Sequence, residues 1–164
     1  MLTVLHQAGS AELSELLRDA PAASPGLVQQ VVDKACRRFP SLVQPERSAR
    51  IELLIRDRAW TEAALALIEL ELPQWQLRRI AYDGGEWYCA LSRERELPDW
   101  LDQSIEAHHN DLALALLGAF VEAQHISVAA SRSSVPPSGG TRRDFHGPLS
   151  IDDFARLASL PSWS

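Results

Sequence analysis

The stretch WQLRRIAYDGGEWYCALS, from Trp75 to Ser92, predicts a β-hairpin and decides the fold class of the chain. Its two halves are rich in strand-forming residues and flank the turn residues Asp83-Gly84-Gly85. A three-residue loop with Gly85 in the left-handed conformation separates apolar from polar side chains better than a two-residue loop does. We therefore expect the three-residue loop. It would give one face with Trp75, Leu77, Arg79, Ala81, Trp87, Cys89 and Leu91, and another with Gln76, Arg78, Ile80, Tyr82, Glu86, Tyr88, Ala90 and Ser92.

Helix signals surround this hairpin. Capping residues, prolines and apolar periodicity predict a helix from Ser10 to before Pro21, one from Ser24 to Pro40, one over Pro45–Asp57, one over Thr61–Leu72 and a long one over Asp99–Ala130. The last is apolar on every side between Leu112 and Ala123, as expected of a buried helix. The predicted fold is therefore α+β and mostly α. Its helices surround the long central helix 99–130, and one antiparallel hairpin packs on that helix.

The domain organisation follows from composition. The 164 residues suit one domain, which we place at residues 1–130. Residues 131–149 are dominated by Ser, Pro and Gly and show no periodicity, which predicts a flexible linker. Residues 150–164 begin with a capping-box pattern at Ser150 and Asp153, which predicts a short helix and a tail.

Charge and apolar content exclude several classes of protein. The formal net charge is −6 and the basic pairs are scattered, so we expect no nucleic-acid binding. The longest apolar run, Leu112–Val121, is too short to span a bilayer, and the N-terminus has no signal-peptide pattern. Cys36 and Cys89 match no zinc or redox spacing. We therefore expect a cytoplasmic protein with free thiols and no membrane association.

Two Glu-x-x-His patterns, Glu106–His109 and Glu122–His125, are the motifs closest to a metal site. On one continuous helix they would lie about 24 Å apart and face nearly opposite ways, so they would not share a metal. The chain has no nucleophile elbow, Walker loop or dinucleotide fingerprint. We expect no catalytic residue, no metal ligand and no cofactor.

A pattern of aromatic, basic and small residues runs through the hairpin: Trp75-x-x-x-Arg79-x-x-Tyr82-x-x-Gly85-Glu86-Trp87-x-Cys89-x-Leu91-Ser92, followed by Leu97-Pro98. It resembles that of a family of uncharacterised bacterial proteins of similar size. The resemblance covers about residues 60–125. It implies a bacterial cytoplasmic origin and assigns no role to any residue.

The first functional hypothesis is a non-enzymatic interaction or regulatory protein, expected as a homodimer. The helices at 62–72 and 112–123 are apolar all round, and large exposed apolar patches usually mark interfaces. The same hypothesis includes a protein partner that binds through residues 131–164.

The alternative hypothesis is a small-molecule site, with or without catalysis, between the 75–92 hairpin and the 99–130 helix. Its ligand-binding residues would be Arg78, Tyr82, Tyr88 and His109, with Arg holding an anion and Tyr or His moving a proton. A buried Arg79 beside an unpaired His109 would favour such a site. The same residues paired with Glu86 or Glu106 would favour a structural role.

Overall fold

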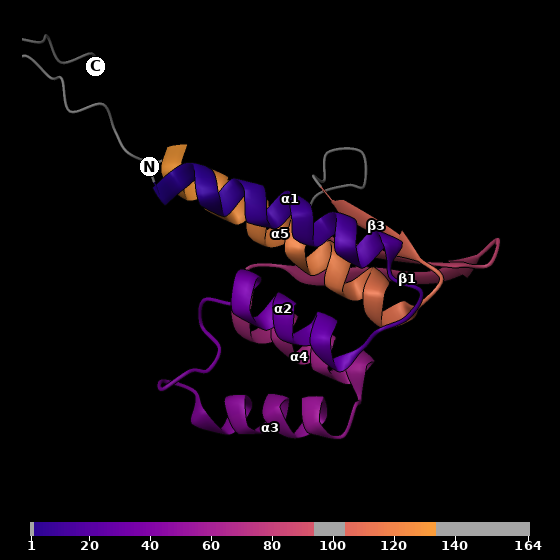
Figure 1. The fold of residues 1–164 in the computed structure, drawn as a ribbon, viewed down its shortest axis with the longest axis horizontal. Coiled ribbons are helices and arrows are strands. Elements are labelled where there is room, and N and C mark those ends of the chain that lie inside the picture. The colour runs from indigo at the N-terminus through magenta and orange to yellow at the C-terminus, as the bar shows by residue number, and fades with distance from the viewer. Residues whose placement is uncertain (1, 94–103, 134–164) are drawn as a thin grey trace, which may run out of the picture. The chain divides into compact units, whose positions relative to one another are not determined.

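The computed structural model describes residues 2–93 and 104–133, and Figure 1 shows their fold. Five helices and three strands follow one another in this described part: α1 (Leu2–Asp19), α2 (Pro25–Ala35), α3 (Pro45–Arg56), α4 (Trp60–Glu71), β1 (Gln76–Asp83), β2 (Glu86–Ser92), β3 (Ile105–His109) and α5 (Leu112–Ser133). The strands form one antiparallel sheet in the order β1-β2-β3. The α+β, mostly α prediction is confirmed.

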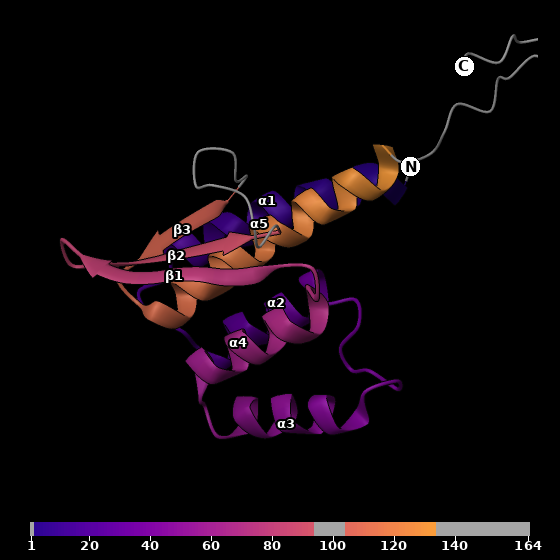
Figure 2. The same cartoon turned by 180° about the vertical axis from the view of Figure 1, so that it is seen from behind.

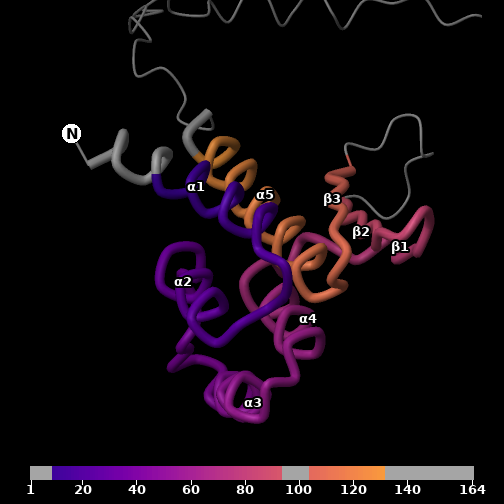
Figure 3. Tube along the Cα trace, turned by 45° about the vertical axis from the view of Figure 1, so that its right-hand side comes forward, coloured from indigo at the N-terminus to yellow at the C-terminus, as the bar shows by residue number. Residues whose placement is uncertain are grey.

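Helix α5 lies at the centre of the arrangement. One face of the sheet rests on α5, α1 runs beside α5, and the opposite face of the sheet carries no helix of the described part (Figures 1 and 2). Helix α2 packs against α1 and α5, α4 packs against α5, and α3 packs on the side of α4 away from α5 (Figure 3). The expected role of the long apolar helix as the core element is therefore confirmed.

The core is built on the apolar length of α5. Leu116, Ala119, Phe120 and Ala123 are fully inaccessible to solvent. They join one continuous cluster with side chains from α1, α2, α4 and the sheet. Full burial of one such large side chain stabilises the fold by about 1.5–3 kcal/mol.

The start of this helix differs from the prediction. Helix α5 begins at Leu112 rather than at Asp99, because Asp111 caps it: its Oδ1 accepts hydrogen bonds from the main-chain N–H of Ala113 (2.8 Å) and Leu114 (3.4 Å). Residues 105–109, expected to be helical, form β3 instead. Ile105 is buried in the core while Glu106 and His108 are exposed, which is the alternation of a half-buried strand.

The hairpin has a two-residue turn, so the expected three-residue loop is wrong. Asp83 pairs with Glu86, and Gly84 and Gly85 have φ angles of 60° and 94°. Two successive positive φ angles match a type I′ turn, whose twist suits a tight hairpin. A bulge between Leu77 and Arg79 then shifts the register. Leu77 therefore lies opposite Leu91, which corrects the polarity mismatch that favoured the longer loop.

Helix α1 begins at Leu2, so the expected start at Ser10 is wrong, whereas α2 and α3 begin where the sequence places them. The hydroxyl of Ser24 accepts a hydrogen bond from Leu27 N (3.3 Å) and Pro25 occupies the first turn of α2, as predicted. Helix α3 begins at Pro45 as expected. Helix α4 begins at Trp60 with Ala59 at its N-cap, so Thr61 is not the cap.

The surplus of apolar surface that suggested a homodimer is covered within the chain. In α4, Ala63, Ala64, Leu67, Ile68 and Leu70 are all buried, and α5 is enclosed by α1, α4 and the sheet. The most exposed large apolar side chains of the described part lie elsewhere, at Leu42 and Val43 in the loop before α3. The expected homodimer would therefore have to form through a surface other than these two helices.

The expected domain boundaries can be compared with the structure only over the described residues. All of those residues belong to one compact unit, Met1–Ser134, and α5 extends into the start of the expected 131–149 linker. The rest of that linker and the expected 150–164 helix lie outside the described residues. In length and composition the segment Leu112–Ser131 also meets the criterion for a membrane span, but half of it is buried in this fold, and core helices meet the same criterion.

The turn predicts unequal effects of substitution at its two glycines. A Cβ at either position meets no atom within 4 Å, so any cost comes from the backbone conformation alone. We expect Gly85→Ala to lower the free energy of unfolding by about 1–2 kcal/mol, because alanine disfavours positive φ. Gly84→Asn should change it by less than about 0.5 kcal/mol, because asparagine tolerates the left-handed region. Urea unfolding measures both, and equal stability of the Gly85→Ala variant and the parent would contradict the turn.

Candidate functional site

The four residues expected to bind a ligand do not form one site. Tyr82 and His109 flank Trp87 in adjacent strands, on the face of the sheet that packs towards α5. The rings of Tyr82 and Trp87 are 4.9 Å apart. Tyr88 lies on the opposite face. Arg78 lies at the bulge, four residues and therefore about 13 Å along the strand from Tyr82.

His109 has a structural role beside the cap of α5. Its Nδ1 accepts a hydrogen bond from the main-chain N–H of Asp111 (2.9 Å). The second carboxylate oxygen of Asp111 accepts a bond from Ala23 N (3.1 Å) in the connection between α1 and α2. This chain of bonds fixes where β3 ends, where α5 begins and where α1 turns into α2.

Tyr88 belongs to a separate polar group on the outer face of the sheet. Its ring packs against that of His108, with 5.7 Å between centroids. Nδ1 of His108 lies 3.2 Å from Oε2 of Glu86. Arg79 is exposed and lines an open hollow of about 280 Å³ with Tyr88 and Glu106. In the described part of the chain neither Arg79 nor His109 is paired with Glu86 or Glu106, so the criterion stated from the sequence does not decide between the two roles.

Several basic side chains of the described part of the chain converge along α5, in a groove that the sequence did not indicate. Two hollows of about 60 and 250 Å³ share Arg37, Gln124 and Val128 in their walls. We call them together the α5 groove. Its further lining comes from Ser10, Leu13, Lys34, Ala35, Val121, His125 and Ala129 in the smaller hollow, and from Arg38, Glu71, Leu72, Pro73, Gln74, Trp75, Arg93, Ser127 and Ser131 in the larger one.

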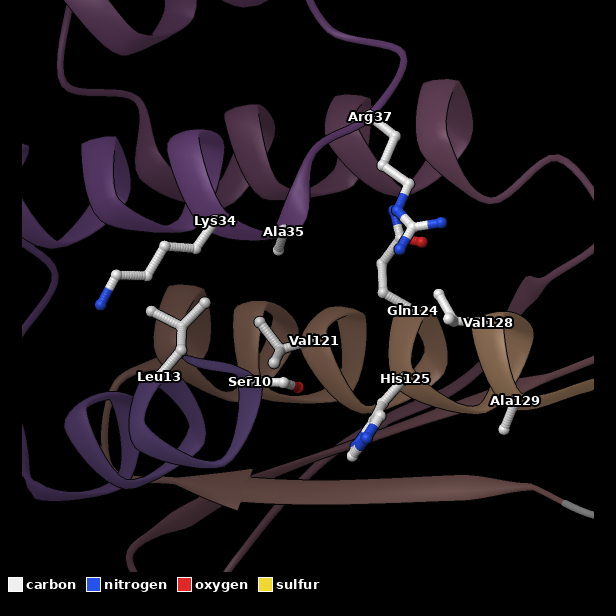
Figure 4. A pocket seen from close by; sticks show the side chains of 10 residues that line it. All are labelled: Ser10, Leu13, Lys34, Ala35, Arg37, Val121, Gln124, His125, Val128 and Ala129. Carbon is white, nitrogen blue, oxygen red and sulfur yellow. The ribbon is translucent and has the colours of Figure 1, made fainter. Parts of the chain in front are cut away.

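The smaller hollow has an apolar floor and a basic upper rim. Figure 4 shows Val121, Gln124 and Val128 rising from α5 towards the end of α2. The guanidinium group of Arg37 extends down towards Gln124, whereas the amino group of Lys34 extends away along α2 (Figure 4). Lys34 Nζ lies 3.7 Å from Glu12 Oε2, so its charge is partly compensated.

A buried carboxylate holds the basic rim in place. Glu71, at the end of α4, is 5% exposed. Its Oε1 accepts bonds from the main-chain N–H of Arg38 (2.7 Å) and Phe39 (2.6 Å). Its Oε2 accepts bonds from Arg37 N (2.9 Å) and from the side-chain amide of Gln124 on α5 (3.1 Å). The carboxylate therefore binds the turn after α2 through its main chain and leaves the two arginine side chains exposed at the groove.

The far wall of the larger hollow is built on Trp75. Its indole N–H donates to the hydroxyl of Ser127 on α5 (2.9 Å), which satisfies a buried polar group. The guanidinium of Arg93 lies 5.5 Å from the centre of the Trp75 ring and donates to Gln74 Oε1 (3.4 Å). Arg93 is thereby held over an aromatic face in the lining of the larger hollow.

The electrostatics of the groove differ from those of the whole chain. The formal net charge is −6, but the groove lining includes Lys34, Arg37, Arg38 and Arg93, and its one carboxylate is the buried Glu71. In the described part of the chain no ion pair joins Glu71 to Arg37 or Arg38, because main-chain donors occupy its oxygens. The exposed part of the groove is therefore positively charged.

The two cysteines of the chain, of which Cys36 lies beside the groove, have raised thiol pKa values. Burial raises the pKa of the Cys36 thiol strongly, and the negative charges of Glu71 and Asp33 add to this effect. Burial also raises the pKa of Cys89 to about 11. Since the thiolate is the nucleophile, both cysteines are poor nucleophiles at neutral pH.

The two Glu-x-x-His patterns do not form a metal centre. The first lies in β3 rather than on a helix, so Glu106 and His109 point to opposite faces of the sheet. The second lies on α5, as expected. Within residues 2–93 and 104–133, no group of three or more His, Cys, Asp or Glu side chains is placed to hold a metal ion.

Comparison with protein-family models, with curated proteins and with solved structures finds no match to this chain. The resemblance of the hairpin to uncharacterised bacterial proteins therefore stays a prediction.

We call the four hydrogen bonds to the Glu71 carboxylate the Glu71 clamp. It predicts that two glutamates of the same helix differ greatly in how much they stabilise the fold. We expect Glu71→Gln to lower the free energy of unfolding by about 2–4 kcal/mol, because the amide replaces one acceptor oxygen with a donor that faces other donors. The exposed Glu69 is the matched control, and Glu69→Gln should change the value by less than about 0.5 kcal/mol. Urea unfolding compares them, and a similar small effect at both positions would show that the clamp is not stabilising.

Proposed function

We propose that this chain is a non-enzymatic binding protein whose α5 groove takes an acidic segment of a partner protein. The observation that carries the proposal is the contrast in charge. Four basic side chains line one groove of a chain with a net charge of −6, and the single carboxylate in the lining is buried and fully hydrogen-bonded. An acidic partner is the charge complement of such a rim.

The groove also provides the apolar contacts that a peptide needs. Val121 and Val128 on α5 line the smaller hollow, and Val128 and Trp75 line the larger one. Interfaces commonly combine an apolar centre with a charged rim, and aromatic and arginine residues contribute most of the binding energy. We infer an occupant with acidic side chains that reach Arg37, Arg38 and Arg93, and with at least one apolar side chain between them.

We infer binding rather than catalysis from the hydroxyl and thiol groups at the groove, which are hydrogen-bonded within the wall or have a raised pKa. The hydroxyl of Ser127 accepts from Trp75, and that of Ser131 donates to the carbonyl of Ser127 (2.9 Å). The nearby Cys36 thiol has a raised pKa. These groups support the wall of the groove, and none is paired with a general base within the described residues.

The proposal predicts the kind of peptide selected from a random library. Panning the immobilised full chain should enrich acidic peptides with apolar residues, and added salt should weaken their binding because the contacts are exposed charges. The double variant Arg37→Glu/Arg38→Glu should bind the enriched peptides at least about tenfold more weakly, as measured by fluorescence anisotropy.

The matched control reverses two exposed arginines on α3 and should leave peptide binding unchanged: Arg47→Glu/Arg50→Glu. Enrichment of neutral or basic peptides would contradict the proposal, as would an equal loss in both double variants. Tighter binding of a single-stranded oligonucleotide than of any peptide would replace the acidic partner with a nucleic acid.

A further inference from the structure

The outer edge of β3 is a second surface with the features of a binding site. Because the strand order is β1-β2-β3, β3 pairs with β2 on one side, and no described strand pairs with its other side, where Ser14, Leu17 and Arg18 of α1 line an open hollow with Glu106–His109. Such an edge presents main-chain N–H and C=O groups that another strand can bind. Within Ile105–His109 the side chains of Glu106 and His108 are exposed, whereas Ile105 is buried against the core.

The opposite edge of the sheet, formed by β1, has features that hinder pairing with a further strand, and the β3 edge lacks them. Strand β1 contains a bulge between Leu77 and Arg79, and it carries two adjacent positive charges at Arg78 and Arg79. Bulges and like-charged side chains are devices by which natural sheets prevent pairing at an edge. Strand β3 is regular against β2 from Ile105 to His109, and it has neither a bulge nor two adjacent like charges.

The sequence of β3 is complementary to itself. In an antiparallel pair related by a two-fold axis at Ala107, Glu106 of one copy lies opposite His108 of the other, on the outer face. On the inner face Ala107 meets Ala107, and Ile105 meets His109. Directly opposed residues of opposite charge stabilise an antiparallel pair, and a small residue at the axis allows close approach.

The position of His108 suits this arrangement. Its Nδ1 lies 3.2 Å from Glu86 Oε2, which orients the ring on the outer face. Within the part of the chain that the structure describes, its Nε2 has no hydrogen-bond partner. The side chain of His108 is 62% exposed, so in the imidazolium form, which donates from both ring nitrogens, Nε2–H is accessible to a carboxylate from a neighbouring strand.

We propose that β3 pairs with β3 of a second copy of this chain, antiparallel and with the two-fold axis at Ala107. The pairing joins two three-stranded sheets into one continuous sheet, with Glu106 of each copy bound to His108 of the other. This isologous contact is closed, because each copy uses its one open β3 edge. It is separate from the α5 groove and does not depend on what that groove binds.

Two single variants and their mixture test this register. Glu106→Lys alone places a lysine opposite His108, and His108→Glu alone places a second glutamate opposite Glu106. Each variant should dimerise at least about tenfold more weakly than the parent in analytical ultracentrifugation. A mixture of the two should restore the dimer. In the mixed pair the introduced lysine faces the introduced glutamate, and the unchanged His108 of one copy faces the unchanged Glu106 of the other.

Controls separate this proposal from the groove and from misfolding. Arg79→Glu on the β1 edge and the groove variant Arg37→Glu/Arg38→Glu should dimerise as the parent does. Circular dichroism of each variant should match that of the parent. A monomeric parent chain would overturn the proposal, as would single variants that dimerise normally or a mixture that stays monomeric.

Discussion

The carboxylate of Glu71 is the interaction on which the arrangement of the helices depends. A buried charge costs several kcal/mol unless hydrogen bonds compensate it, and here four donors do so. Three of them are consecutive main-chain N–H groups of Arg37, Arg38 and Phe39, and the fourth is the side chain of Gln124. One side chain at the end of α4 thereby joins the turn after α2 to the core helix α5, and Phe39 packs with the side chains between α3 and α4.

The groove and its charge follow from that clamp. Because the oxygens of Glu71 bind main-chain donors, Arg37 and Arg38 are positioned at the rim without being neutralised. Trp75 positions Arg93 on the other side in a similar way, since its own N–H is bound to Ser127. The same buried network therefore stabilises the fold and leaves positive charge at the surface of an acidic chain. Burial and the charge of Glu71 raise the pKa of the nearby Cys36 thiol, which makes it a poor nucleophile at neutral pH.

The sequence predicted the elements with strong local signals. Ser24-Pro25 and Pro45 mark helix starts, and the paired glycines mark a hairpin. The run Leu112–Ala123 marks the core helix because it is apolar all round. The start of the core helix was predicted wrongly because residues 105–109 fit the periodicity of a helix as well as that of a strand. In the structure they form β3, and α5 begins only after its cap at Asp111. The turn length was wrong because the bulge at Leu77 shifts the faces, and a face pattern alone does not reveal a bulge.

The candidate site was harder to predict because its residues are distant in the chain. One signal was present: Glu71 is an acid near the end of an apolar helix. Its partners at residues 37–39 are main-chain groups, which carry no sequence signature. The most direct test of the clamp is amide hydrogen exchange of Arg37, Arg38 and Phe39 in the native protein, followed by NMR. The clamp predicts that these amides exchange as slowly as those of α4. Exchange as fast as at the exposed Leu42 and Val43 would contradict it.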